Sequence, residues 1–127
     1  MAGVLAVASI AWACTVVAGS TWYSDGTRTK SGPPGTQITA RATGAVTGVP
    51  YHLVIGDMGT EPGHSTHACM RTLQVINPAT VFATSTGRIG NVSGTVTYSV
   101  PGTYQLCFKD STPNNSTGTG GANFTVL

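Results

Sequence analysis

Two segments far apart in the chain, SGPPGTQITARAT (residues 31–43) and PGTYQLCF (residues 101–108), decide the fold. Each begins with a turn sequence, because proline fixes φ and removes a hydrogen-bond donor while glycine admits positive φ. Each then continues as a strand. In residues 37–43 apolar and polar side chains alternate, as they do in a strand with one buried face. Together the two segments indicate an all-β sandwich of an extracellular type.

The composition fits one exported domain rather than a cytosolic enzyme. The chain has 127 residues, room for a single core, and only 8% of them are charged, against roughly 25% in ordinary soluble proteins. The net charge is +2 and the basic residues are scattered singly, whereas a nucleic-acid-binding protein shows a basic stripe interleaved with aromatic residues. We therefore expect no nucleic-acid partner.

Turn residues divide the rest of the chain into further short strands. We predict strands at Trp22 and Tyr23 and at residues 37–43, 51–55, 69–76, 94–100, 103–109 and 123–127, with another short one considered at 81–84. Asn77-Pro78 is expected to end the strand before it. Polar loops are predicted at residues 24–35, 56–65 and 110–121. Seven or so short strands favour a sandwich over a βαβ fold.

Three segments resemble the immunoglobulin-like (Ig-like) domains of prokaryotic cell-surface and extracellular proteins. They are residues 31–43, GNVSGTVTYSV (residues 90–100) and residues 101–108. The resemblance covers residues 20–127 and implies an Ig-like antiparallel β-sandwich of about seven strands, preceded by an apolar N-terminal segment. Such domains serve as spacers, adhesins, filament subunits and carbohydrate-binding accessories, so the resemblance implies more about fold than about function.

Residues 1–19 form that apolar segment, and no charge occurs between Ala2 and Gly19. Ala11-Trp12-Ala13 has the small-x-small form that signal peptidase cleaves, and Cys14 follows it. A secretory signal is therefore expected, although no Lys or Arg precedes the apolar run. Two alternatives stay open: a lipobox-like site that lipidates Cys14 and attaches the chain to a membrane, and a segment donated to a neighbouring subunit of a filament.

Three cysteines are an odd number for an exported protein. We predict a disulfide between Cys69 and Cys107, which would close a loop of about 38 residues and contribute roughly 3–4 kcal/mol. Cys14 is then left to be removed, lipidated or cross-linked. A Cys14–Cys107 bridge is the alternative if the N-terminal segment is retained.

His64 and His67 raise the possibility of a copper site, because two imidazoles lie close to Cys69 and Met70 in the sequence. The PGTY turn followed by Cys107 also resembles the strand that supplies the copper cysteine in cupredoxins. No His and Met follow Cys107 as that family requires. Copper is the one cofactor considered, and no catalytic constellation is expected.

Asn91 and Asn115 belong to N-glycosylation sequons and are predicted to lie at loop tips, whereas the sequon at Asn123 is expected within a strand. Trp22 and Tyr23 are the one aromatic pair considered as a ligand platform. The sequence thus predicts an exported, non-enzymatic Ig-like module with a structural or adhesive role at the cell surface. Its expected partners are other surface proteins, cell-wall glycan or copies of itself. The alternatives are a subunit of an extracellular filament and a periplasmic copper-binding, cupredoxin-like protein.

Overall fold

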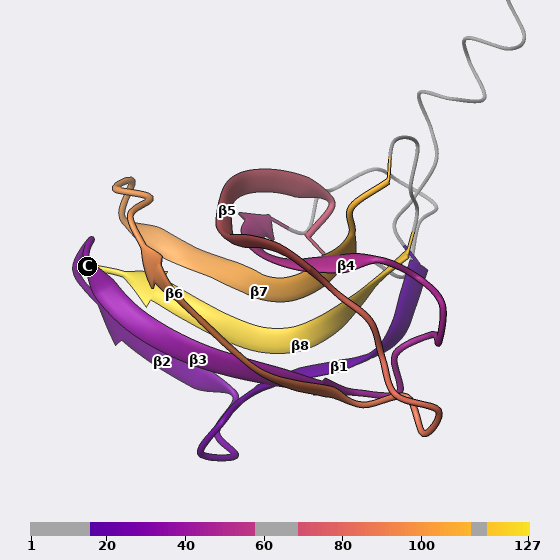
Figure 1. Ribbon diagram of the computed structural model, residues 1–127. Helices are drawn as coiled ribbons and strands as arrows, with labels where there is room; N and C mark the ends of the chain where they lie inside the picture. The colour runs from indigo at the N-terminus through magenta and orange to yellow at the C-terminus, as the bar shows by residue number, and fades with distance from the viewer. Residues whose placement is uncertain (1–15, 58–68, 113–116) are drawn as a thin grey trace, which may run out of the picture.

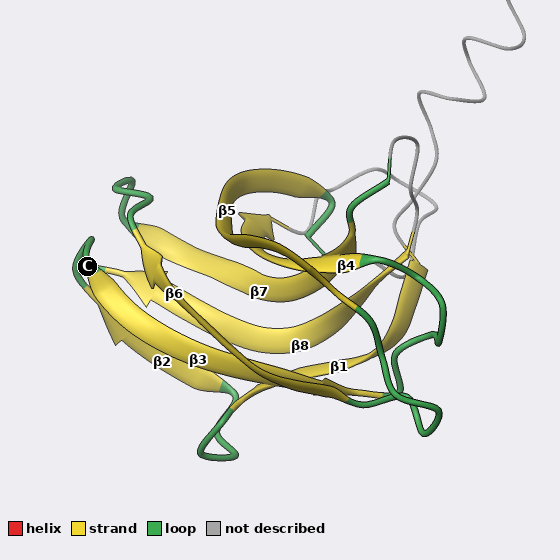
Figure 2. Cartoon of the chain, in the orientation of Figure 1, coloured by secondary structure: helices red, strands yellow, loops and turns green. Residues whose placement is uncertain are grey.

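The computed structural model describes residues 16–57, 69–112 and 117–127, and within them it contains strands and no helix (Figure 2). There are eight strands in the described residues: β1 (Val16–Tyr23), β2 (Thr29–Gly32), β3 (Thr36–Thr43), β4 (Tyr51–Asp57), β5 (Arg71–Val81), β6 (Ile89–Val96), β7 (Gly102–Asp110) and β8 (Thr117–Val126). The all-β prediction is confirmed.

All eight strands belong to one sheet. Seven of them follow the order β5-β4-β7-β8-β1-β3-β6, and β2 pairs with β8 outside this order. β1 leaves β8 at Ser20 and continues along β3, and β2 takes its place beside the last residues of β8. β1 and β2 both run parallel to β8, so the sheet is mixed and the prediction of a purely antiparallel arrangement was wrong. Only strands joined by a tight turn must be antiparallel, and no turn joins β8 to β1 or β2.

The sheet curves so strongly that its two edges, β5 and β6, meet in a nearly closed barrel (Figure 1). Side chains of β5 span this seam. Gln74 Nε2 donates to Thr95 O at 2.9 Å, and Gln74 Oε1 accepts from the backbone N–H groups of Thr97 and Tyr98 at 2.8 and 2.9 Å. Gly94 lets the strands approach, because a Cβ on it would lie 2.5 Å from Ile76 Cγ2.

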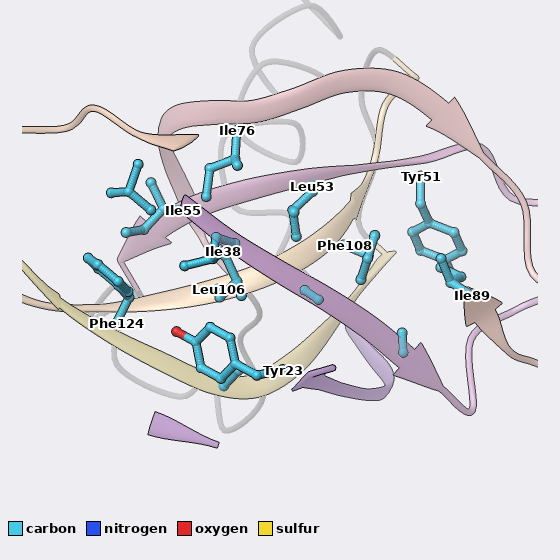
Figure 3. Packing of buried hydrophobic residues seen from close by; sticks show 14 of the residues in the cluster. Tyr23, Ile38, Tyr51, Leu53, Ile55, Ile76, Ile89, Leu106, Phe108 and Phe124 are labelled. Carbon is cyan, nitrogen blue, oxygen red and sulfur yellow. The ribbon is translucent and has the colours of Figure 1, made fainter. Parts of the chain in front are cut away.

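One hydrophobic core fills the barrel (Figure 3). β3 contributes Ile38, Ala40 and Ala42, the inward set that the alternation in the sequence predicted. The largest fully buried side chains are Tyr23, Tyr51, Phe108, Phe124, Leu53, Ile55 and Leu106. Each such side chain stabilises the fold by about 1.5–3 kcal/mol relative to its exposed state.

Several predicted strand limits were wrong for identifiable reasons. β5 passes through Pro78 to Val81 because an edge strand tolerates proline, and no separate strand forms at 81–84. β6 begins at Ile89 and ends at Val96, earlier than predicted. β2 and the first half of β8 lie in stretches that were predicted as loops, because Gly, Thr and Ser there gave no alternating pattern.

The first strand also starts earlier than predicted. β1 begins at Val16 and pairs with β8 from that residue onward, so the predicted boundary between residues 19 and 20 falls inside a strand. Residues 16–19 therefore belong to the folded domain rather than to the apolar segment before it.

Candidate functional site

A shallow polar hollow of about 290 Å³ lies where β1 ends, and it is the candidate binding site. Ser24 and Asp25 of the β1–β2 turn and Lys30 of β2 line one side, and β3 and β6 line the other with Gln37, Ile38, Thr39 and Ser93. We call this set the polar hollow. All of its lining residues except Ile38 carry a polar or charged side chain, so its chemistry is that of hydroxyl, amide, carboxylate and ammonium groups.

The turn after β1 places Asp25 at the hollow. Gly26 has a φ of +88°, which glycine adopts without strain, and its N–H donates to Tyr23 O at 2.9 Å. Asp25 Oδ1 accepts from Thr27 N at 3.0 Å and from Thr27 Oγ1 at 2.8 Å, while Asp25 Oδ2 accepts from Lys30 Nζ at 2.6 Å. The carboxylate is thus fixed by three hydrogen bonds.

β3 and β6 form the other side because alternate side chains of a strand point to one face. Gln37 and Thr39 point outward from β3 while Ile38 between them points into the core. Thr39 and Ser93 are cross-strand partners, and their hydroxyl oxygens lie 2.8 Å apart. Ser24 N donates to Thr39 O at 2.9 Å, which ties the turn to β3 and fixes the width of the hollow at this point.

The two charges at the hollow are paired. The hydrogen bond from Lys30, aided by those from Thr27, holds the pKa of the Asp25 carboxyl well below its ordinary value. The Lys30 ammonium also lies 5.5 Å from the centroid of the Tyr23 ring, within range of a cation–π contact. Asp25 and Lys30 side chains are both exposed to solvent, with 49% and 41% of their surface accessible. The pair therefore organises the surface more than it stabilises the fold.

Trp22 and Tyr23 do not form a platform together, which corrects the prediction. They are consecutive residues of β1, so their side chains point to opposite faces of the sheet. Tyr23 is fully buried, and its Oη donates to Asn123 O at 2.6 Å (Figure 3). Trp22 is half-buried on the outer face, where the guanidinium of Arg28 lies 4.5 Å from the ring centroid. Burial raises the pKa of the Tyr23 hydroxyl, so this tyrosine stays protonated as a donor.

The predicted disulfide between Cys69 and Cys107 is present, with the two Cα atoms 6.1 Å apart. Both residues are fully buried beside Val54, outside the main core. Cys69 has a φ of +50°, and its N–H donates to Gln105 Oε1 at 2.8 Å. Cys107 is therefore not paired with Cys14, which lies outside the described residues.

The other predicted site residues are only partly covered by the structure. His64, His67 and Asn115 lie outside the described residues. Among the residues that are described, no three His, Cys, Asp or Glu side chains gather in a way that could hold a metal ion. Asn91 was predicted at a loop tip, but it lies within β6, with an exposed side chain, because pairing with β3 begins at Ile89.

His52 is the one histidine of the described residues, and it lies half-buried on β4. Burial, helped by the nearby Lys109 charge, lowers its pKa. The shift favours the neutral form of the His52 imidazole.

No helix long and apolar enough to cross a membrane occurs in residues 16–57, 69–112 and 117–127. The proposed role of residues 1–19 as a signal, anchor or donated segment concerns residues that lie mostly outside these ranges.

Sequence reasoning missed the polar hollow. The Asp25-Gly26 pair is a turn signal that places a carboxylate at a turn. Nothing in the sequence indicates that Gln37 and Ser93 lie beside it, because that depends on how β1 crosses from β8 to β3. No protein-family model matches the chain, and neither a curated protein nor a solved structure is significantly similar to it.

Proposed function

We propose that this chain is an exported, non-enzymatic Ig-like module with an adhesive role at the cell surface. The strand pairings support the Ig-like part of the proposal. An Ig domain pairs its B and E strands in one sheet and its C, F and G strands in the other. If β3, β4, β6, β7 and β8 are taken as B, C, E, F and G, the pairs β3–β6, β4–β7 and β7–β8 match that pattern.

A tyrosine at the start of β7 supports the same reading. Tyr104 Oη donates to Val100 O at 2.8 Å, four residues upstream. Many Ig-like domains carry such a tyrosine corner near the start of strand F. The disulfide differs from the usual one between strands B and F, because Cys107 of β7 is bonded to Cys69, which precedes β5.

The disulfide supports export. Disulfides form and persist in oxidising compartments and are rare in cytosolic proteins. Cys69 and Cys107 are both fully buried, so reductants reach their sulfur atoms only when the fold opens. The disulfide is therefore compatible with a location outside the cytoplasm, and within that range we propose the cell surface or the extracellular medium rather than the periplasm.

The polar hollow is the observation that carries the adhesive role. A module that serves only as a spacer needs no hollow on its outer face, whereas here Asp25 and Lys30 are fixed in one arrangement beside hydroxyl and amide groups. Rigid polar groups at a concave surface reduce the entropy lost when a partner binds. The partner is a component of the envelope, either glycan or protein.

The test is binding of the purified, fluorescently labelled full chain to isolated cell envelopes of the source organism. The proposal predicts saturable binding that unlabelled chain displaces. Envelopes stripped of protein by protease show whether the partner is glycan. Binding that never saturates, or an equal signal on phospholipid vesicles without envelope material, would contradict an adhesive role. Self-association in the absence of envelopes would favour the filament alternative instead.

A further inference from the structure

We propose that the polar hollow binds a neutral, hydroxyl-rich saccharide. This proposal rests on the adhesive role proposed above and names the ligand class for that same site. It follows from three features of the lining: its charge, its free hydrogen-bonding groups and its size.

The charge of the lining disfavours ligands that carry a single sign of charge. Asp25 and Lys30 are the charged residues of the hollow, and their side chains lie 2.6 Å apart, so the lining has no net charge. A phosphate group would meet the Asp25 carboxylate, and a metal ion would meet the Lys30 ammonium. A neutral ligand avoids both of these repulsions between like charges, and it can hydrogen-bond to both groups at once.

The lining keeps hydrogen-bonding groups available for such a ligand. Among the described residues, no side-chain hydrogen bond involves the Gln37 amide or the Ser24 hydroxyl. Lys30 uses one of its three N–H donors on Asp25. Asp25 Oδ2 accepts this one bond and can accept another, whereas Oδ1 already accepts two bonds from Thr27. Each sugar hydroxyl can donate and accept a hydrogen bond. Two adjacent hydroxyls can therefore bond at the same time to the two polar atoms of an amide or a carboxylate.

The backbone of β3 adds a further pair of groups. Thr39 O accepts from Ser24 N, so the peptide groups of Thr39 point toward β1. Peptide groups two residues apart in a strand point to the same edge, so those of Gln37 point there too. β1 ends at Tyr23, which pairs with Ala40, so β1 does not extend far enough to pair with Gln37. The Gln37 N–H and C=O are thus placed to bond to a ligand in the hollow.

The size and openness of the hollow suit a short saccharide that continues into solvent. At about 290 Å³ it is at the lower end for a ligand site, since such pockets measure about 300–1,000 Å³. Trp22 lies two residues before Ser24 in the chain, on the same outer face. Its indole ring offers an aromatic surface that Arg28 already covers in part. We expect a dissociation constant on the order of 1 mM for a single ring.

The experiment is a titration of the ¹⁵N-labelled full chain with cellotriose, maltotriose, mannotriose and chitotriose, with glucuronate as the charged comparison, followed by NMR. The proposal predicts saturable shifts at the backbone amides of Asp25, Gln37 and Ser93 with at least one neutral trisaccharide. In Gln37→Ala/Ser93→Ala the affinity falls about tenfold. The control Ser85→Ala/Ser99→Ala, at exposed hydroxyls outside the hollow, binds as the wild type does.

Three results would overturn the saccharide proposal: saturable shifts with none of the trisaccharides, shifts that lie away from the hollow, or saturation with glucuronate alone. A measurement of binding to envelopes distinguishes a failure of the saccharide proposal from a failure of the adhesive role. If Gln37→Ala/Ser93→Ala still binds envelopes as the wild type does, the hollow is not the contact and the adhesive role stands. If the wild type itself fails to bind envelopes, the adhesive role fails.

Discussion

The Tyr23 hydroxyl links β1 to β8 through one hydrogen bond. The Tyr23 ring is fully buried and its Oη donates to Asn123 O at 2.6 Å, across from β1 to β8. Tyr23→Phe keeps the ring and removes the donor, which leaves the Asn123 carbonyl without this partner. We expect the free energy of unfolding to fall by about 1–2 kcal/mol. Urea denaturation checks this, and an unchanged midpoint would mean that the hydroxyl contributes nothing.

Lys30 is the main cause of the lowered pKa of Asp25. Lys30→Met removes the ammonium while Thr27 still donates, so the pKa of Asp25 rises toward its ordinary value of about 3.9 without reaching it. ¹³C NMR titration of the carboxyl measures this change. The matched control is Lys109→Met on β7, which leaves the Asp25 pKa where it is because Lys109 is not among the groups that perturb it.

The sign of the resulting pH dependence follows from linkage. A carboxyl whose pKa is lower in the folded state stabilises the fold above the unfolded value of about 3.9, and this contribution is lost as the pH falls through the folded-state pKa. The acid limb of the unfolding curve should therefore move to higher pH in Lys30→Met. An acid limb that stays in place would show that the Asp25–Lys30 pair does not contribute to stability.

At the scale of single residues, the sequence predicted those features that depend on residues close together in the chain. The turn at Pro33–Gly35 was predicted from its proline and glycine residues, although residues 31, 32, 36 and 102–104 of the predicted turn sequences lie in strands. The Cys69–Cys107 disulfide was also predicted and is present. The Trp22–Tyr23 platform failed because strand alternation, which the same sequence shows elsewhere, places the two rings on opposite faces. The Asp25–Gln37 juxtaposition needed long-range geometry.

At the scale of elements, the seam between β5 and β6 has no room for added volume at Gly94. A Cβ on Gly94 would lie 2.5 Å from Ile76 Cγ2 and 2.7 Å from Ile76 O. A backbone oxygen cannot move aside without displacing β5, so Gly94→Ala should destabilise the protein by about 1–3 kcal/mol. Denaturant unfolding of the purified variant measures the change.

Gly90 offers a matched control on the same strand. A Cβ there meets nothing within 4 Å, so Gly90→Ala should change the stability by no more than about 0.5 kcal/mol. Equal effects of the two substitutions would show that β6 does not approach β5 closely at Gly94.

Hydrophobic alternation predicted some elements well and misplaced others. Residues 94–100 alternate, yet β6 ends at Val96. Residues 37–43 were predicted nearly to their observed limits because inward apolar residues alternate there with polar ones. Residues 103–109 were predicted as closely, although four consecutive residues, 105–108, are buried there. β2 and the start of β8 are built from Thr, Ser, Lys and Gly, so neither has a hydrophobic pattern, and both form strands through backbone pairing with their neighbours.

At the scale of the whole molecule, the disulfide connects two parts of the chain that are 38 residues apart. Closing a loop of that length removes conformational entropy from the unfolded chain, worth about 4 kcal/mol at 25 °C in the chain-entropy model. Cys69→Ala/Cys107→Ala should lower the free energy of unfolding by that order, and reductant should have no further effect on it. Wild type that is equally stable with and without reductant would contradict this prediction.

The overall architecture could be predicted only in outline. Turn chemistry and strand count indicated an all-β domain, but the parallel pairing of β1 and β2 with β8 joins the two ends of the domain and leaves no local pattern. The polar hollow lies where β1 leaves β8 for β3, and Gln74 spans a separate seam between β5 and β6. For this reason the candidate site emerged from the structure and not from a motif.

The most direct test of the central claim, an exported and disulfide-bridged module, is a non-reducing peptide map of the native protein after cell fractionation. We expect to recover the protein from the cell-surface or extracellular fraction, with a linked peptide that contains Cys69 and Cys107. Recovery from the cytoplasmic fraction, with both thiols free to react with an alkylating reagent, would contradict it.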